Sequence, residues 1–149
     1  MQAVQTMQRG EGMIQQEAGM VLVVEDDEDI AQLLCYSLRK NRVPVAVAHD
    51  GMTAFAIVEQ LRPALILLDV MLPRLDGHEV CRLIRSHLDR DLAGTPVVML
   101  SALSTPRDIE KGMGLGANAY FAKPYSIKDV VAATMKWLGG TGERLKAQG

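Results

Sequence analysis

The sequence has 149 residues, of which 48% are hydrophobic and 23% are charged, and its formal net charge is −2. This length and balance are typical of one globular domain with a hydrophobic core, and they exclude an intrinsically disordered chain. The near-neutral charge gives no basic surface for nucleic acid. The longest apolar runs fall far short of the ~18 residues of a membrane span, and the N-terminus lacks a secretory signal pattern.

Strand and helix patterns alternate along the sequence after its N-terminal stretch. Residues 1–19 are rich in glutamine and show no hydrophobic period, which predicts a flexible tail. Val21–Val24 is an apolar run of strand length, and the apolar spacing over residues 30–38 predicts the first helix. Val43–Ala48 is rich in β-branched residues and predicts a second strand, and helical spacing over Met52–Leu61 predicts a second helix.

The alternation continues with the most hydrophobic run of the chain, Ala64–Leu68, which suits a strand covered on both faces. A helix is predicted over Gly77–Leu88, and a loop over Asp89–Pro96 leads into a strand at Val97–Leu100. Pro106 opens a short helix that fades in the stretch with Gly112, Gly114 and Gly116. A strand follows at Ala119–Ala122, and Ser126 caps a last helix that runs to about Leu138.

Five strands that alternate with five helices predict the α/β class, with a doubly wound parallel sheet and helices on both faces. Residues 20–138 then make one domain, with the tail 1–19 before it and a C-terminal tail or linker over 139–149 after it. Cys35 and Cys81 fall in predicted helices without the spacing of metal ligands, so we expect reduced thiols and a cytoplasmic protein.

Polar residues follow four of the predicted strands at their carboxyl ends. They are Glu25 and Asp26 after the first strand, Asp69 after the third, Ser101 after the fourth and Lys123 after the fifth. In an open parallel sheet these ends lie at one edge, where α/β folds bind ligands. We therefore expect the five side chains to share one site.

Three clustered carboxylates point to a divalent cation. Two carboxylates about 4 Å apart repel each other by roughly 4 kcal/mol at an effective dielectric near 20. A hard ion with oxygen ligands, above all Mg²⁺, relieves this repulsion and also binds phosphate. Glu25, Asp26 and Asp69 are the expected ligands, whereas residues 27–29 suit the positive end of the first helix, with Asp29 as its cap.

The position of Asp69 indicates phosphoryl chemistry, because burying a carboxylate without a partner is expensive. A carboxylate can attack phosphorus and form an aspartyl phosphate. Lys123 can then neutralise phosphoryl oxygens, and the Ser101 hydroxyl can donate a hydrogen bond to one of them. Taken alone, Ser101 would be read as a helix cap and Lys123 as a surface lysine, so their shared position carries the prediction.

Four segments together resemble the response-regulator receiver domain of two-component signalling. They are VLVVEDDED, LILLDVMLPRLDG, VVMLSA and AYFAKP, which stand in the family's order and spacing over about residues 19–138. The resemblance implies a five-stranded parallel sheet in the flavodoxin-like order 2-1-3-4-5. It also implies that the chain receives a phosphoryl group from a phosphohistidine on a sensor histidine kinase or a histidine phosphotransfer protein.

The resemblance assigns a role to each matching position. Asp69 looks like the phosphoacceptor, and Mg²⁺ would be held by Glu25, Asp26, Asp69 and the backbone carbonyl of Met71. Glu25 stands where aspartate is more frequent, and its longer arm can reach the metal through water. The other matches are Ser101 as the switch hydroxyl, Tyr120 as the aromatic that changes rotamer, Lys123 as the family's lysine, and Lys123–Pro124 as a peptide bond that is usually cis.

The implied function is a phosphorylation switch. Phosphorylation would reshape the face formed by the fourth helix, fifth strand and fifth helix of the prediction, and this face would bind a downstream protein or form a homodimer. We expect the chain to catalyse only its own phosphorylation and dephosphorylation, and to bind neither nucleic acid nor a membrane. Both a single-domain regulator and a receiver from a longer protein fit the sequence.

Two other functions fit the same layout less well. A metal-dependent phosphatase with Asp69 as its nucleophile commonly has a second acid two residues later, where this chain has Met71. A nucleotide-binding Rossmann domain needs a glycine-rich turn after the first strand, where the EDDED run would repel phosphates. A protein-binding module that no longer accepts phosphate also remains open, although every site residue of the family is present.

Overall fold

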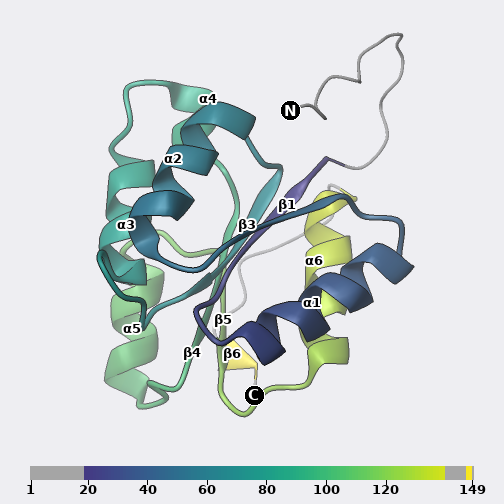
Figure 1. Cartoon of the computed structure of the whole chain (residues 1–149). Helices are drawn as coiled ribbons and strands as arrows, with labels where there is room; N and C mark the ends of the chain where they lie inside the picture. Colours follow the sequence, from purple (N-terminus) through teal and green to yellow (C-terminus); the bar gives the residue numbers. More distant parts are fainter. Residues whose placement is uncertain (1–18, 140–146, 149) are drawn as a thin grey trace, which may run out of the picture.

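A parallel sheet runs through the centre of the molecule, which is a computed structural model that describes residues 19–139 and 147–148 (Figure 1). The strands are β1 (Val21–Val24), β2 (Val45–Ala48), β3 (Leu65–Asp69), β4 (Val97–Ser101), β5 (Ala119–Ala122) and β6 (Ala147–Gln148). Their order is β2-β1-β3-β4-β5-β6, and every neighbouring pair is parallel. The predicted order 2-1-3-4-5 is confirmed, and the two-residue β6 extends the sheet at β5.

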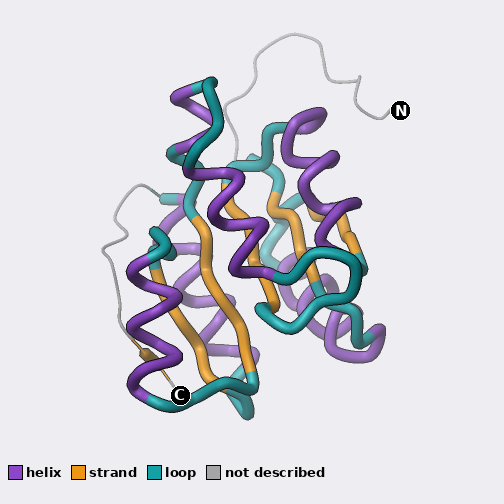
Figure 2. The backbone as a smooth tube through the Cα atoms, turned by 90° about the vertical axis from the view of Figure 1, so that its left-hand side faces the viewer, coloured by secondary structure: helices purple, strands orange, loops and turns teal. Residues whose placement is uncertain are grey.

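Helices cover both faces of the sheet, as the sequence predicted. They are α1 (Glu28–Lys40), α2 (Gly51–Leu61), α3 (Gly77–Arg85), α4 (Arg90–Ala93), α5 (Pro106–Gly114) and α6 (Ile127–Leu138). The helices α1 and α6 share one face, and α2, α3, α4 and α5 cover the other (Figure 1). Figure 2 views the molecule from the side of this second group, with the strands running side by side behind it.

Alternation along each strand divides the core into two layers. Val21 and Val23 of β1 pack with α1 and α6, while Leu22 and Val24 pack with α2 and α3, and all four side chains are fully buried. The third strand is buried at each of its five positions, which explains its unbroken apolar sequence. Each buried aliphatic side chain stabilises the fold by about 1.5–3 kcal/mol relative to an exposed one.

The region between α3 and β4 differs from the prediction. The helix predicted over Gly77–Leu88 ends at Arg85, and Leu88 is 98% exposed. The predicted loop Asp89–Pro96 contains the one-turn helix α4, which Asp89 caps by accepting hydrogen bonds from the amides of Asp91 and Leu92. A single turn is too short to show a hydrophobic period, so the sequence pattern did not predict α4, whose Leu92 is buried.

The helix ends match the predicted caps with one exception. Pro106 is the first residue of α5, and the Ser126 hydroxyl caps α6 by accepting a hydrogen bond from the Asp129 amide at 3.2 Å. The prediction that Asp29 caps α1 is wrong, because the Asp27 side chain accepts the hydrogen bonds from the first free amides, including that of Asp29 itself at 2.9 Å. Asp27 directly precedes the first helical residue and so has the extended backbone that a cap requires.

The predicted N-terminal tail lies outside the described residues except for Gly19, as does much of the C-terminal segment that follows α6. The two residues of that segment that form β6 pair with Tyr120 and Phe121 of β5. Among the described helices, none combines the length and the apolar character needed to cross a bilayer.

Candidate functional site

The carboxyl ends of four neighbouring strands bring the predicted side chains to one edge of the sheet. Asp69 and Ser101 are the last residues of β3 and β4, and Glu25 and Lys123 directly follow β1 and β5. The register places these ends at the same level, since Asp69 pairs with Leu100 and the neighbouring residues follow in step. The geometry therefore follows from a parallel sheet whose strands end together.

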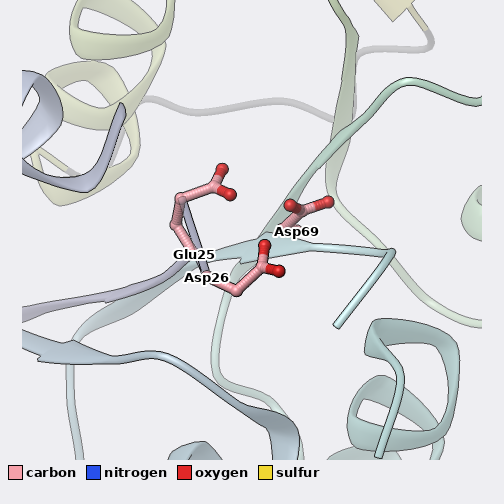
Figure 3. Close-up of side chains that lie close together, drawn as sticks. All are labelled: Glu25, Asp26 and Asp69. Atoms are coloured by element: carbon pink, nitrogen blue, oxygen red, sulfur yellow. The ribbon is translucent and has the colours of Figure 1, made fainter. Parts of the chain in front are cut away.

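Glu25, Asp26 and Asp69 form a compact acidic cluster (Figure 3). Each offers a carboxylate oxygen, and these ligand atoms all lie within 4.8 Å of one another. Glu25 and Asp69 are buried, whereas Asp26 is exposed and leaves the cluster open to solvent. Two buried carboxylates and an exposed third form a hard oxygen donor set that fits Mg²⁺.

Lys123 joins the acidic cluster from the end of β5. Its Nζ donates hydrogen bonds to Oδ2 of Asp69 at 3.1 Å and to Oε1 of Glu25 at 3.3 Å. Burial alone would lower the pKa of the Lys123 ammonium, but the Asp69 and Glu25 carboxylates together raise it above its ordinary value. The site therefore holds a positive charge directly against the carboxylate of the predicted phosphoacceptor.

The Glu25 carboxylate is costly to ionise where it lies. Burial, followed by the neighbouring Asp69 carboxylate, raises its pKa from 4.5 to about 7. The Asp27 amide, which donates to Oε2 at 3.2 Å, and the Lys123 ammonium oppose this rise. A bound divalent cation would relieve the same repulsion, so the electrostatics of these residues fit the metal that the sequence predicted.

Backbone amides orient the predicted acceptor and hold the loop that follows it. The Met71 amide donates to Oδ1 of Asp69 at 3.1 Å, so Met71 contacts the acceptor through its backbone while its side chain is 56% exposed. The Gly77 amide donates to the Val70 carbonyl at 2.7 Å. A Cβ at Gly77 would lie 2.3 Å from the Asp69 carbonyl, so only glycine lets α3 begin this close to β3.

Ser101 and Tyr120 are connected through Leu103. The Leu103 amide donates to the Ser101 hydroxyl at 3.0 Å, and the Tyr120 hydroxyl donates to the Leu103 carbonyl at 2.6 Å. The Tyr120 ring is fully buried and lies against α5, where a Cβ at Gly112 would approach it to 2.9 Å. A movement of Ser101 therefore reaches Tyr120 through one residue of backbone.

Three groups near the site were missed from the sequence. His49 follows β2 at the same edge, and its Nδ1 lies 2.9 Å from the Glu25 carbonyl, so the rule that located the acids would also have found it. The Leu103 backbone carries no side-chain signal. Tyr125 lies two residues after Lys123, and its hydroxyl is buried without a hydrogen-bond partner in the described part of the chain.

Residues 21–135 match the protein-family model described as the response regulator receiver domain. The chain belongs to this family. The DNA-binding response regulator MtrA of Mycobacterium tuberculosis H37Rv is 41% identical to it over 112 residues, which are 75% of this chain and 47% of MtrA. The chain thus spans about half the length of the curated relatives it matches.

Solved receiver domains share the fold. The receiver domain of the Francisella response regulator 1452 aligns with a TM-score of 0.76 at 30% identity, covering 83% of this chain and 98% of that one. The receiver domain of a sensor histidine kinase from Pseudomonas aeruginosa PAO1 aligns with a TM-score of 0.73 at 29% identity, covering 83% and 99%. That structure has a magnesium ion coordinated in its active-site cleft. Our chain is therefore a receiver domain of two-component signalling, a system that implies a kinase partner.

The Lys123–Pro124 peptide of this receiver domain is cis, as the resemblance implied. The structure also brings Glu25, Asp26, Asp69 and Lys123 together, as the sequence predicted.

Proposed function

We propose that this receiver domain accepts a phosphoryl group from a phosphohistidine onto Asp69, and that the phosphorylated form controls a partner protein. The observation that carries the proposal is the environment of one carboxylate. Asp69 is 2% exposed, lies 3.1 Å from the Lys123 ammonium, and shares a set of oxygens within 4.8 Å with two further acids. A buried carboxylate with a cation beside it and a metal-binding set around it suits a nucleophile towards phosphorus.

Glu25, Asp26, Asp69 and the backbone carbonyl of Met71 would hold Mg²⁺, which neutralises charge on the phosphoryl oxygens when it is bound. The protein's own residues provide positioning and further charge neutralisation. An Asp69 oxygen forms the new bond to phosphorus while the phosphorus–nitrogen bond breaks, and the electron pair of that bond goes to the imidazole. Lys123 can donate to a phosphoryl oxygen because two carboxylates already hold its ammonium at the acceptor.

Ser101 and Tyr120 would pass the change to the outer face. The Ser101 hydroxyl would turn from the Leu103 amide to a phosphoryl oxygen, which frees Leu103 to move. The Leu103 carbonyl accepts the hydrogen bond from the Tyr120 hydroxyl, so Tyr120 would be freed with it. Tyr120 belongs to β5 and packs against Gly112 of α5, so its movement biases the face formed by α5, β5 and α6. This is the face that the sequence predicted to bind a downstream protein or a second copy.

We infer that the domain acts on no separate substrate and catalyses only its own phosphorylation and dephosphorylation. Its proposed phosphodonor is a sensor histidine kinase or a histidine phosphotransfer protein, and we propose the cytoplasm as its location because such donors would act there. The MtrA proteins are named as DNA-binding regulators over their full length, whereas this chain spans about half of it. That the chain itself contacts no nucleic acid stays a prediction.

Intact-mass spectrometry tests the acceptor directly. The protein is incubated with a small-molecule phosphodonor and Mg²⁺, and wild type is compared with Asp69→Asn and with Asp91→Asn, an exposed acid on α4. Wild type and Asp91→Asn should each gain one acid-labile phosphoryl group, while Asp69→Asn gains none. Equal phosphorylation of Asp69→Asn would overturn the assignment.

A further inference from the structure

The hydroxyl of Tyr125 is buried and donates to no acceptor in the described part of the chain. A buried hydroxyl without a partner is unfavourable, and each such group calls for an explanation. Phenylalanine would fill the same space without this cost. The hydroxyl therefore points to a hydrogen bond that forms in another state of the domain.

Tyr125 stands beside the proposed phosphorylation site. It follows Lys123 by two residues, and both line a groove of about 470 Å³ with Ile30 and Leu33 of α1. The Tyr125 ring packs against the core layer of α1 and α6, which limits where its hydroxyl can move. Lys123 and Tyr125 thus lie against the same groove.

Glu25 is a buried carboxylate acceptor, and it already contacts Lys123, which lines the same groove as Tyr125. Burial raises the pKa of Tyr125 far above its ordinary value, and the Glu25 carboxylate adds more to this rise than Asp69 or Asp27 does. The phenol thus stays protonated and able to donate at neutral pH. Glu25 currently accepts from the Lys123 ammonium through Oε1 and from the Asp27 amide through Oε2.

We propose that the Tyr125 hydroxyl replaces Lys123 as hydrogen-bond donor to Glu25 when a phosphoryl group on Asp69 attracts the lysine. This inference rests on the proposed function, because it requires Lys123 to turn towards the phosphoryl oxygens. Oε1 of the buried Glu25 carboxylate then loses the hydrogen bond from Lys123, and a second donor would keep that oxygen satisfied and the carboxylate in place. Tyr125 is therefore a positioning residue that keeps Glu25 oriented and favours the phosphorylated state.

The replacement Tyr125→Phe tests this through two measurements on the full chain. Urea unfolding of the free protein should show equal or greater stability, because the lost hydroxyl had no partner. The affinity for beryllium trifluoride with Mg²⁺, a phosphoryl analogue, should fall about tenfold, because a hydrogen bond to a charged group is lost only in the complex. Tyr36→Phe, at a side chain that is 63% exposed, is the matched control and should change neither quantity.

Nuclear magnetic resonance supplies a readout that a purely structural role would not move. The ¹³Cζ resonance of Tyr125 should shift when the analogue and Mg²⁺ are added, because its hydroxyl then donates to a carboxylate. The resonance of Tyr36 should stay in place.

The outcomes separate this inference from the function on which it rests. A wild-type protein that does not bind the analogue would overturn both. Wild-type binding together with unchanged affinity in Tyr125→Phe, or a Tyr125→Phe protein destabilised equally with and without the analogue, would overturn the inference alone.

Discussion

Replacing Glu25 by glutamine should stabilise the metal-free protein above pH 7 and leave its stability nearly unchanged below pH 4.5. The pKa of Glu25 is raised from 4.5 to about 7, first by burial and then by Asp69. Below pH 4.5 the residue is protonated in both the folded and the unfolded chain. Between these values the unfolded chain loses the proton and the folded chain keeps it, so wild-type stability falls as the pH rises.

The expected size of the effect follows from the same shift. At about 1.4 kcal/mol for each pH unit, the rise from 4.5 to about 7 corresponds to about 3 kcal/mol above pH 7. The Glu25 side chain is 1% exposed, so solvent screening takes little from this figure. The glutamine amide can donate to Asp69, and its oxygen can keep the hydrogen bond from the Asp27 amide or from Lys123.

Urea unfolding followed by circular dichroism, with a chelator present, measures the effect at pH 4.5 and pH 8. Glu28→Gln, an exposed acid in the first turn of α1, is the matched control and should show no gain at pH 8. Adding Mg²⁺ at pH 8 should stabilise the wild type and narrow its difference from Glu25→Gln. An advantage of the variant that is equal at both pH values, or absent at pH 8, would refute the electrostatic reasoning.

Three further replacements probe other parts of the structure. Lys123→Met should slow phosphorylation by a small phosphodonor by about 100-fold, since it removes a donor at the developing charge; a rate within twofold of wild type contradicts this. Gly77→Ala should lower the free energy of unfolding by about 2 kcal/mol and slow phosphorylation, because its Cβ meets the Asp69 carbonyl at 2.3 Å; Gly114→Ala, where the Cβ meets nothing within 4 Å, is the control. Arg85→Met should lower the free energy of unfolding by about 3 kcal/mol at pH 5 and pH 8 alike, because several partly buried oxygens lose their donor; a loss below about 1 kcal/mol would show that water replaces the guanidinium.

The fold and the acidic site could be predicted because the same local sequence pattern recurs at several strands of the sheet. An unbroken apolar run followed by a polar residue marks both the strand and the edge at which it ends, as at Leu65–Asp69. The cap of α1 was misplaced because EDDED offers several carboxylates in succession, and only backbone geometry selects Asp27. The helix α4 was missed because one turn shows no period. The strand β6 was missed because its two residues are too few to show a strand pattern.

Contacts that join distant loops were beyond prediction for a different reason. Arg85 donates to the carbonyls of Ala93, Thr95 and Gly116 and to the Asn118 side chain. Its acceptors are mostly backbone carbonyl oxygens, which every residue type has, so the residue types at these positions do not reveal the contacts. The φ of Gly116 is +106°, and a Cβ there would lie 2.8 Å from Nε of Arg85, so glycine is required on both grounds. The sequence showed the glycine but not its neighbour.

Arg85 and Lys123 are both partly buried cations, but phosphorylation acts on them differently. Arg85 donates to neutral carbonyl and amide oxygens, whose charge does not change on phosphorylation. Arg85 should therefore tie α3 to the loops before β4 and β5 both with and without the phosphoryl group. Lys123 contacts two carboxylates, and one of them is the proposed acceptor. A phosphoryl group on Asp69 adds nearly two negative charges beside its ammonium. Lys123 must therefore respond to phosphorylation, and Glu25, which it also holds, must respond with it.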